Sequence, residues 1–295
     1  MNYFQLNNGL KIPVIGAGTY PYKEELEESI PVMMDIGFRL FDTSDNYDNE
    51  QFVGNALGRL SKESLESLLI VTKYSNPFKS VKEAFEESAE KIFSKTALPD
   101  RKPDIYLLHW PYPFLWKKRW KEMEQLCIDG KCKGIGICNF TNNYLKKLLS
   151  ICKVKPVINQ FECHPMFQQN DTIKLCNKND IQVMCYSPLA RMNKVLFDNE
   201  ILNQIASNKE KSVGQIILNW NISEGRIPIP ASNNQEHIKE NFESISFDLS
   251  KDELEKIDSL EKGMRIRFAP EKRFTKKQKL FFFIFFCKTV LGIRK

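Results

Sequence analysis

The sequence predicts an α/β protein, a (β/α)8 TIM barrel with an N-terminal β-hairpin cap and a basic, aromatic C-terminal tail. Eight strand-like apolar runs alternate with helix-like amphipathic segments, a pattern typical of βαβ units and a parallel sheet. With 295 residues, of which 42% are hydrophobic, the chain can bury a full barrel core, for which about 250 residues are typical. We therefore predict two units, a barrel over residues 1–262 and a tail over residues 263–295.

The first element is predicted to be a hairpin, because Asn8 and Gly9 separate two short apolar runs and an Asn-Gly pair favours a tight turn. The strands are predicted, within a few residues, at 14–18, 38–42, 69–73, 105–109, 134–138, 157–160, 182–186 and 226–230. Segments between them, such as 23–35, 80–94 and 116–127, carry apolar and charged residues at helical spacing. Eight strands with helical crossovers close into a barrel.

Composition narrows the class of protein. The N-terminal residues MNYFQLNNGLKIP lack the basic start and apolar core of a secretory signal, so we expect a cytoplasmic protein. The eight cysteines include no C-x-x-C pair and are expected to be free thiols of a reducing compartment. The three histidines, His109, His164 and His237, are too scattered for a zinc site, so we expect no metal.

Four polar residues stand at or near the ends of three successive predicted strands. Asp42 follows the run FRLF, Tyr47 comes five residues later, Lys73 ends LLIVTK and His109 ends DIYLLH. Taken singly, such residues are more often turn, packing or core residues than catalysts. Together they predict an active site, because a β/α barrel builds its site where the carboxyl ends of its strands meet.

These residue types suit the reduction of a carbonyl group. A site that accepts a hydride at carbon must protonate the oxygen, and a phenol can do so if a cation lowers its pKa. Tyr47 is the candidate acid and Lys73 the candidate cation, with Asp42 holding the proton on the buried amine. His109 would orient the carbonyl. The predicted catalytic set is Tyr47, Lys73, Asp42 and His109.

With this set the chain resembles the aldo-keto reductases over roughly residues 3–260. The segments GKCKGIGICNF, NQFECHP and CYSPLA are similar to that family's motifs at its fifth, sixth and seventh strands. The resemblance implies an NAD(P)H-dependent oxidoreductase that reduces an aldehyde or ketone, with sugar-derived carbonyls among the candidates. The hydride would come from the nicotinamide and the proton from Tyr47.

The resemblance also implies a set of cofactor-binding residues. Asn139 and Gln160 would hold the nicotinamide carboxamide, and Tyr186 would stack on the ring. Cys138 stands where the family usually has Ser, and a thiol is a weaker donor than a hydroxyl. The full set implied is Gly18, Thr19, Tyr20, Asp42, Cys138, Asn139, Gln160, Tyr186, Ser187, Leu189, Ser232, Asn233, His237, Glu240 and Asn241.

The eighth strand departs from the pattern of NADPH-preferring relatives, in which a Lys and an Arg clamp the 2'-phosphate. Here Ala231 occupies the Lys position and His237 the Arg position. Charge-assisted hydrogen bonds contribute about 1.5–3 kcal/mol each, so losing both weakens phosphate binding by about 10² or more. The cofactor is therefore predicted as NADP(H) or NAD(H), with Arg226 or Lys239 as alternative cations.

The substrate is predicted to be a small-molecule carbonyl compound. The loop after His109 is short and leaves an open cleft, and the substrate-binding residues are predicted to be Tyr20, Trp110 and His109. Phe78, Tyr112 and Phe114 are further candidates for an apolar wall.

The basic residues concentrate in the tail. Residues 262–295 hold 11 Lys and Arg against one acid, a net charge of +10 in a chain of net +6, which leaves −4 for residues 1–261. A helix over 280–293 would rise about 21 Å, short of the roughly 30 Å hydrocarbon core of a bilayer. The tail thus predicts peripheral contact at the inner membrane face. Packing of its Phe run on the barrel or on a second subunit is the alternative, and the chain is predicted to be a monomer or weak dimer that binds no nucleic acid.

Two other functions stay open. A non-catalytic or weakly catalytic nucleotide-binding regulatory subunit would couple to a membrane partner through the tail. A barrel aldolase would use Lys73 as a Schiff base, but that function leaves Tyr47 and the YSPL segment without a role.

Overall fold

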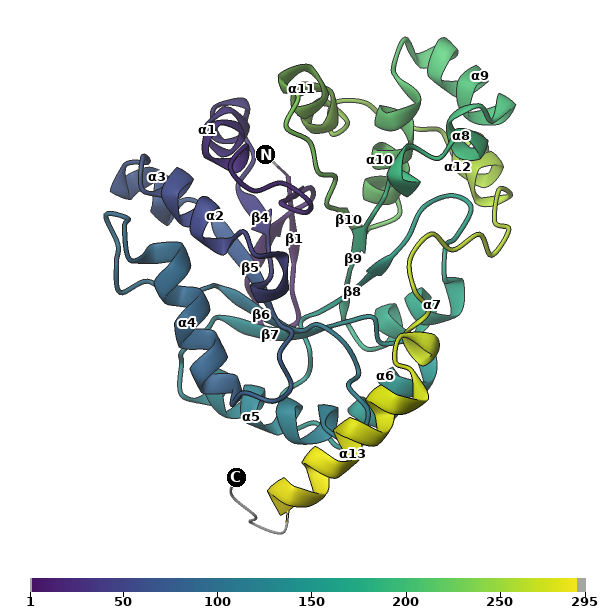
Figure 1. Cartoon of the computed structure of the whole chain (residues 1–295). Helices are drawn as coiled ribbons and strands as arrows, with labels where there is room; N and C mark the ends of the chain where they lie inside the picture. The colour runs from purple at the N-terminus through teal and green to yellow at the C-terminus, as the bar shows by residue number, and fades with distance from the viewer. Residues whose placement is uncertain (1, 291–295) are drawn as a thin grey trace.

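Parallel strands form the centre of the protein in the computed structural model, which describes residues 2–290 (Figure 1). Within those residues eight strands pair in chain order. They are β3 Ala17–Gly18, β4 Leu40–Asp42, β5 Leu69–Tyr74, β6 Ile105–Leu108, β7 Gly134–Cys138, β8 Ile158–Glu162, β9 Gln182–Tyr186 and β10 Ile227–Pro228. The amides of Gly16 and Gly18 donate to the carbonyls of Pro228 and Pro230 at 3.1 and 3.0 Å, which joins the first strand to the last. The predicted barrel is confirmed.

Alternate residues of the strands fill the barrel interior. Leu40, Val71, Leu107, Ile158 and Met184 belong to one buried cluster, and each comes from a different strand. Because side chains of a strand alternate between its faces, the intervening residues pack outward against the helices. The carboxyl ends of the strands therefore present their last polar residues to one common mouth.

The N-terminal hairpin closes the opposite end, as predicted. Strand β1, Tyr3–Gln5, pairs antiparallel with β2, Lys11–Pro13, and Gly9 adopts the positive φ of 84° that the turn requires. The side-chain amides of Asn7 and Asn8 donate to the carbonyls of Pro156 and Lys133, which lie just before β8 and β7. The hairpin thereby covers the floor of the barrel, opposite the carboxyl ends of the strands.

Helices surround the barrel (Figure 1). Several begin at a serine whose hydroxyl accepts a backbone N–H, such as Ser80 before α4 and Ser212 before α10. The predicted helices at 23–35, 80–94 and 116–127 correspond to α1, α4 and α5. The bounds are α1 Leu26–Ile36, α2 Glu50–Leu57, α3 Lys62–Glu66, α4 Val81–Phe93, α5 Trp116–Ile128, α6 Asn142–Leu149, α7 Asn170–Lys178, α8 Lys194–Phe197, α9 Glu200–Lys209, α10 Val213–Ser223, α11 Gln235–Glu243 and α12 Lys251–Asp258, with short 3-10 helices η1 Asp45–Tyr47, η2 Ala190–Met192 and η3 Pro270–Lys272.

The C-terminal segment crosses the mouth before it becomes a helix. We call residues 264–274 the strap. It starts where the Met264 amide donates to the Met166 carbonyl at 2.9 Å, and it reaches Thr141, whose hydroxyl donates to Glu271 at 2.6 Å. Phe274 ends the strap as a buried residue. The strap therefore passes over the ends of β8 and β7 toward β6.

Helix α13, Lys276–Val290, then runs along the outside of the barrel (Figure 1). Phe282 is buried and stacks on Phe78 with ring centroids 5.4 Å apart, while Phe283 meets Phe114 at 5.2 Å. Packing of the Phe run on the barrel, the alternative to membrane contact, thus accounts for one face of α13. No helix within the described residues is long and apolar enough to cross a bilayer.

Candidate active site

A buried ion pair lies at the base of the mouth. Lys73, fully buried on β5, donates to Asp42 Oδ2 at 2.5 Å and to the Thr43 carbonyl at 2.7 Å. Burial disfavours the charged amine, but the Asp42 carboxylate outweighs it and the pKa of Lys73 is raised. A charged, buried and paired amine cannot attack a carbonyl, so the Schiff-base alternative does not fit this geometry.

Tyr47 lies directly above this pair. It ends η1, the turn that follows β4, and its ring centroid is 4.7 Å from Lys73 Nζ. Burial raises the pKa of Tyr47 to about 12, and the Lys73 cation acts in the opposite direction. The expected net lowering by Lys73 is therefore not seen, because desolvation is the larger effect. The phenol keeps its proton at neutral pH, and the cation is placed to stabilise the phenolate that proton donation would leave.

His109 faces Tyr47 edge-on, with ring centroids 5.8 Å apart. Burial, together with the charges of Lys73, Arg273 and Arg267, lowers the pKa of His109 well below its ordinary value of 6.5. The imidazole is therefore neutral.

Two serine hydroxyls surround one nitrogen of the imidazole. Its Nδ1 is 2.6 Å from the Ser75 hydroxyl and 3.2 Å from that of Ser44. The two hydroxyls are 3.0 Å apart, and Ser44 also donates to Asp45 at 3.3 Å. In the tautomer in which Nδ1 accepts from a serine, Nε2 carries the N–H. The sequence analysis missed both serines, because strands β4 and β5 bring them to His109 only in the folded protein.

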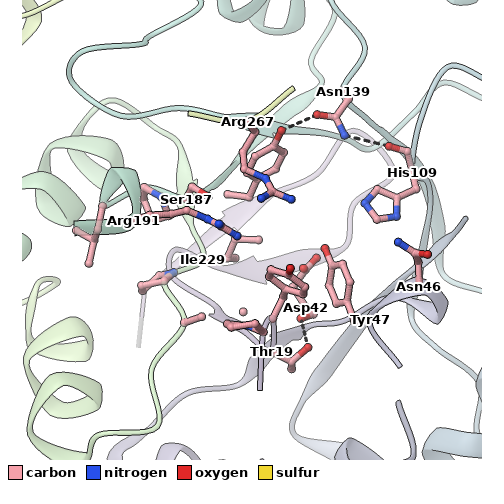
Figure 2. A pocket seen from close by; sticks show the side chains of 18 of the residues that line it. Thr19, Asp42, Asn46, Tyr47, His109, Asn139, Ser187, Arg191, Ile229 and Arg267 are labelled. Atoms are coloured by element: carbon pink, nitrogen blue, oxygen red, sulfur yellow. Dashed lines mark hydrogen bonds between the residues drawn. The ribbon is translucent and has the colours of Figure 1, made fainter. Parts of the chain in front are cut away.

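These side chains open into a pocket of about 650 Å³ (Figure 2). The residues predicted from the sequence that line it are Gly18, Thr19, Tyr20, Asp42, Tyr47, His109, Trp110, Asn139, Tyr186, Ser187 and Leu189. The predicted residues absent from its described lining are Lys73, Cys138, Gln160, Ser232, Asn233, His237, Glu240 and Asn241. The tyrosine, the imidazole and most of the nicotinamide-side residues therefore share one cavity.

Hydrogen bonds order the part of the pocket wall where the resemblance places the nicotinamide. The Tyr186 ring lines the pocket, and its hydroxyl donates to Asn139 Oδ1 at 2.8 Å, while Asn139 Nδ2 donates to the His109 carbonyl at 3.1 Å (Figure 2). Gln160 and Cys138 lie behind this wall, and Gln160 Nε2 donates to Asp42 at 2.6 Å. In this arrangement Gln160 holds the second oxygen of Asp42, so both carboxylate oxygens are engaged.

The phosphate clamp lies at the edge of the pocket. Ala231 lines it, Ser232 is buried with its hydroxyl accepting from the Asn234 amide, and His237 is exposed near the start of α11. Each of the two alternative cations has another contact. Arg226 precedes β10, so it lies at the other end of that strand, where it stacks 4.1 Å above the Trp220 ring.

Lys239 is the other alternative cation, and it pairs with Glu243 at 3.8 Å along its own helix. The described residues thus offer the clamp position neither the Lys nor the Arg of an NADPH-type site.

The aromatic wall predicted after His109 differs from the observed one. Tyr20 and Trp110 line the pocket, whereas Phe78 and Phe114 contact α13 and Tyr112 contacts Phe274. These last three residues are not part of the described pocket lining, because α13 and the strap pack against them, a contact that the sequence does not show.

The strap supplies lining residues instead, namely Arg267, Phe268 and Arg273, and the loop after β9 adds Arg191 and Met192. From the sequence, Arg265, Arg267 and Arg273 were counted only as part of the positive charge of the tail, and no place in the pocket was predicted for them. The pocket therefore draws on residues from both sides of the predicted boundary at 262.

Glu162 fixes the strap to the mouth. This carboxylate ends β8, is fully buried, and accepts from the amides of Ile266 at 2.6 Å and Arg267 at 2.9 Å. Burial disfavours its charge, but hydrogen bonds from His164 and from these two amides outweigh it and lower the pKa of Glu162. A residue of the NQFECHP segment thus positions the strap.

Comparison with known proteins identifies the family. Residues 14–262 match the family model described as the aldo/keto reductase family. The chain is 35% identical over 273 residues to a glyoxal reductase of Bacillus subtilis, covering 91% of this chain and 96% of the relative. It is also 35% identical over 272 residues to the methylglyoxal reductase DkgA of Escherichia coli K12, covering 91% and 96%.

Solved structures agree. An aldo-keto reductase from a Medee basin deep-sea metagenome library superimposes with a TM-score of 0.86 at 29% identity, covering 93% of this chain and all of the other. A Bombyx mori aldo-keto reductase in complex with NADP gives a TM-score of 0.82 at 27% identity, covering 92% and 96%. The chain therefore belongs to the aldo/keto reductase family of NAD(P)H-dependent oxidoreductases.

Proposed function

We propose that this protein reduces an aldehyde or ketone to an alcohol, with Tyr47 as the proton donor. The observation that carries the proposal is the stack of Asp42, Lys73 and Tyr47 beside a neutral His109. A bound nicotinamide supplies the hydride. The residues of the chain hold the carbonyl, deliver the proton and stabilise the charge that remains.

Each group has one task. His109 Nε2–H donates a hydrogen bond to the carbonyl oxygen and turns it toward the Tyr47 hydroxyl. Tyr47 transfers its proton to that oxygen as negative charge develops there. Lys73 stabilises the resulting phenolate, and Asp42 keeps the amine charged. General acid catalysis of this kind typically contributes about 10²–10⁴ in rate.

The proposed substrate is a small aldehyde or ketone, with sugar-derived carbonyls among the candidates. Relatives named for glyoxal and methylglyoxal reduction support small carbonyl compounds. Tyr20, Trp110 and His109 line the pocket and are proposed to contact the substrate.

We propose that both NADPH and NADH serve as cofactor, with a small difference in affinity. Ala231 and the exposed His237 replace the clamp cations, and Arg226 and Lys239 are engaged elsewhere. The proposed contacts of the cofactor are Gly18, Thr19, Asn139, Tyr186, Ser187 and Leu189 from the pocket wall, and Ser232, Asn233, Glu240 and Asn241 toward the adenosine. Gln160 and Cys138 are buried behind the wall and are proposed to support it.

The outer face of α13 is proposed to touch an anionic membrane surface. Leu280 and Ile284 are 58% and 44% exposed, and Lys276, Lys277 and Lys279 are exposed beside them. Phe281 and Phe283 flank this face, where each contacts a barrel aromatic and is still 58% and 45% exposed. Apolar side chains flanked by cations suit the interface of an anionic leaflet. Sedimentation with anionic liposomes tests this: a chain ending at residue 275 should pellet less than the full chain. Equal pelleting of both removes the proposal.

The enzymatic proposal is tested with Tyr47→Phe. Removing only the hydroxyl should lower kcat for methylglyoxal reduction by at least about 10²–10⁴ while NADPH binding, followed by fluorescence, stays normal. Tyr144→Phe is the control, because Tyr144 is a partly buried tyrosine packed on Phe140, away from the pocket lining. Near-normal turnover by Tyr47→Phe would refute the assignment. Nucleotide binding without turnover in the wild type would support the regulatory function instead.

A further inference from the structure

Three guanidinium groups line the pocket without a carboxylate partner. Arg191, Arg267 and Arg273 belong to its wall, whose one described carboxylate, Asp42, is already paired with Lys73. In the part of the chain that the structure describes, the ion pairs formed by arginine involve other residues. Figure 2 shows Arg191 and Arg267 reaching into the cavity that holds Tyr47 and His109. The described pocket lining therefore carries three cations that no carboxylate of the lining neutralises, which suits an anionic ligand.

Arg191 and Arg267 both face the Tyr20 ring, at 5.9 and 6.0 Å from its centroid, and Arg273 lies farther along the mouth at Trp110. Arg191 is exposed and lies in the loop after β9, close in sequence to Ser187 and therefore on the side proposed for the cofactor. Arg267 and Arg273 come from the strap, which is anchored over the ends of β8 and β7 and reaches β6. Parallel strands in chain order place β6 away from β10, where the phosphate clamp lies. Arg273, beside Trp110, is thus on the side of the proposed substrate, and Arg267 lies between Arg273 and Tyr186.

Both strap arginines are close to the reacting groups. The Arg273 guanidinium is 5.4 Å from the Trp110 ring centroid, next to His109, and the Arg267 guanidinium is 6.0 Å from the Tyr20 ring. Both charges contribute to the lowered pKa of His109. An anionic group bound by these arginines would lie on the same side of the pocket as His109 and Trp110.

The pair is built into the fold. Both side chains are half-buried, Glu162 holds the Arg267 amide, and buried Phe274 follows Arg273 directly. Partial burial strengthens an arginine–oxyanion contact relative to an exposed pair, and the planar fork suits carboxylate and phosphate oxygens.

We propose that Arg267 and Arg273 bind an oxyanion of the substrate, so that the preferred substrates are aldehydes or ketones that also carry a carboxylate or a phosphate. The proposal rests on the carbonyl reduction proposed above. Arg267 and Arg273 bind the anionic end, and His109 and Tyr47 hold the carbonyl end. The same site then reduces neutral carbonyls with a higher KM.

The test compares matched substrates. 4-Carboxybenzaldehyde is compared with its methyl ester, and glyceraldehyde 3-phosphate with glyceraldehyde, each with saturating NADPH. For at least one of the two pairs, wild type should show a kcat/KM at least about 10-fold higher for the anion than for its neutral partner. Arg267→Gln and Arg273→Gln should each reduce that ratio by about 10- to 100-fold, mainly through KM. If these variants lower the ratio for only one of the two pairs, the anionic group of that pair, carboxylate or phosphate, is the one that the arginines bind.

Arg265→Gln is the matched control. Arg265 carries the same charge in the same strap, but its guanidinium stacks 4.3 Å above the Phe167 ring and is not part of the pocket lining. This variant should keep the wild-type ratio. An equal loss in Arg265→Gln would mean that the general positive field, and not a binding site, sets the preference, and would overturn the proposal.

Two further outcomes would also overturn it. One is a wild type that reduces methylglyoxal but shows no preference for either anion, which leaves the reductase function intact and removes only the oxyanion site. The other is weaker NADPH binding in Arg267→Gln and Arg273→Gln, by the same factor as the rise in KM. In that case the pair binds cofactor phosphate. If the wild-type protein does not reduce methylglyoxal at all, the proposed function itself is contradicted.

Discussion

Replacing Glu162 by Gln should release the strap from the barrel mouth. The carboxylate accepts the Ile266 and Arg267 amides at 2.6 and 2.9 Å. Hydrogen bonds to a charged group contribute about 1.5–3 kcal/mol each, and Gln keeps one acceptor oxygen but presents an N–H₂ to the other amide. We therefore expect a loss of one such bond, or about 1.5–3 kcal/mol, which makes opening of the strap about 10- to 150-fold more frequent.

The assay is hydrogen–deuterium exchange of the strap followed by mass spectrometry. Protection of the peptide over residues 264–274 should fall by about 10- to 100-fold in Glu162→Gln. Glu124→Gln is the control, because Glu124 is also a buried carboxylate that accepts two backbone amides, those of Lys153 and Val154. This control removes a buried carboxylate charge elsewhere in the barrel and should leave exchange of the strap unchanged.

Acid should act in the same way as Glu162→Gln. The hydrogen bonds lower the pKa of Glu162 below its ordinary value of 4.5, so their stabilisation is complete above pH 4.5 and is lost as the pH falls through the lowered value. If Glu162→Gln lowers global stability while strap exchange stays at the wild-type rate, the carboxylate does not hold the strap and the reasoning is refuted.

Three further predictions follow from the site and the tail. The double change Ala231→Lys, His237→Arg should raise the ratio of NADPH to NADH affinity by about 10² or more, measured by fluorescence titration. Burial raises the pKa of Tyr47 to about 12 and lowers that of His109 well below 6.5, so kcat/KM for reduction should be flat from about pH 7 to pH 9. Phe282→Ala should cost about 3 kcal/mol in urea unfolding, because the ring is buried against the barrel.

Each of these three predictions would be contradicted by a specific result. A wild type that binds NADPH 100-fold tighter than NADH would show that another cation fills the clamp. A titration of kcat/KM near neutral pH would mean that the acid or the imidazole is not held in the stated protonation state. Phe283→Ala is the control for Phe282→Ala, since Phe283 is 45% exposed, and an equal cost for both would contradict the packing of α13.

The sequence alone predicted the barrel, its hairpin and several of the polar side chains that meet at the mouth. Strand and helix periodicity are local properties, and so is the position of a polar residue at the end of a strand. Asp42, Lys73 and His109 could therefore be placed at one mouth before their contacts were known. The motif around Asn139 and the YSPL segment at Tyr186 gave two further wall residues by resemblance.

Only the tertiary structure decided what covers the mouth. The strap places Arg267 and Arg273 in the pocket through a hydrogen-bonded contact between Glu162 and residues more than 100 positions later. The serines around His109 and the partners of α13 depend on similar long-range packing. No local pattern encodes such contacts, because the free energy of docking comes from surfaces that exist only once the barrel has formed. The positive charge of the tail could therefore be counted from the sequence, but the position of Arg267 and Arg273 in the pocket could not be predicted from it.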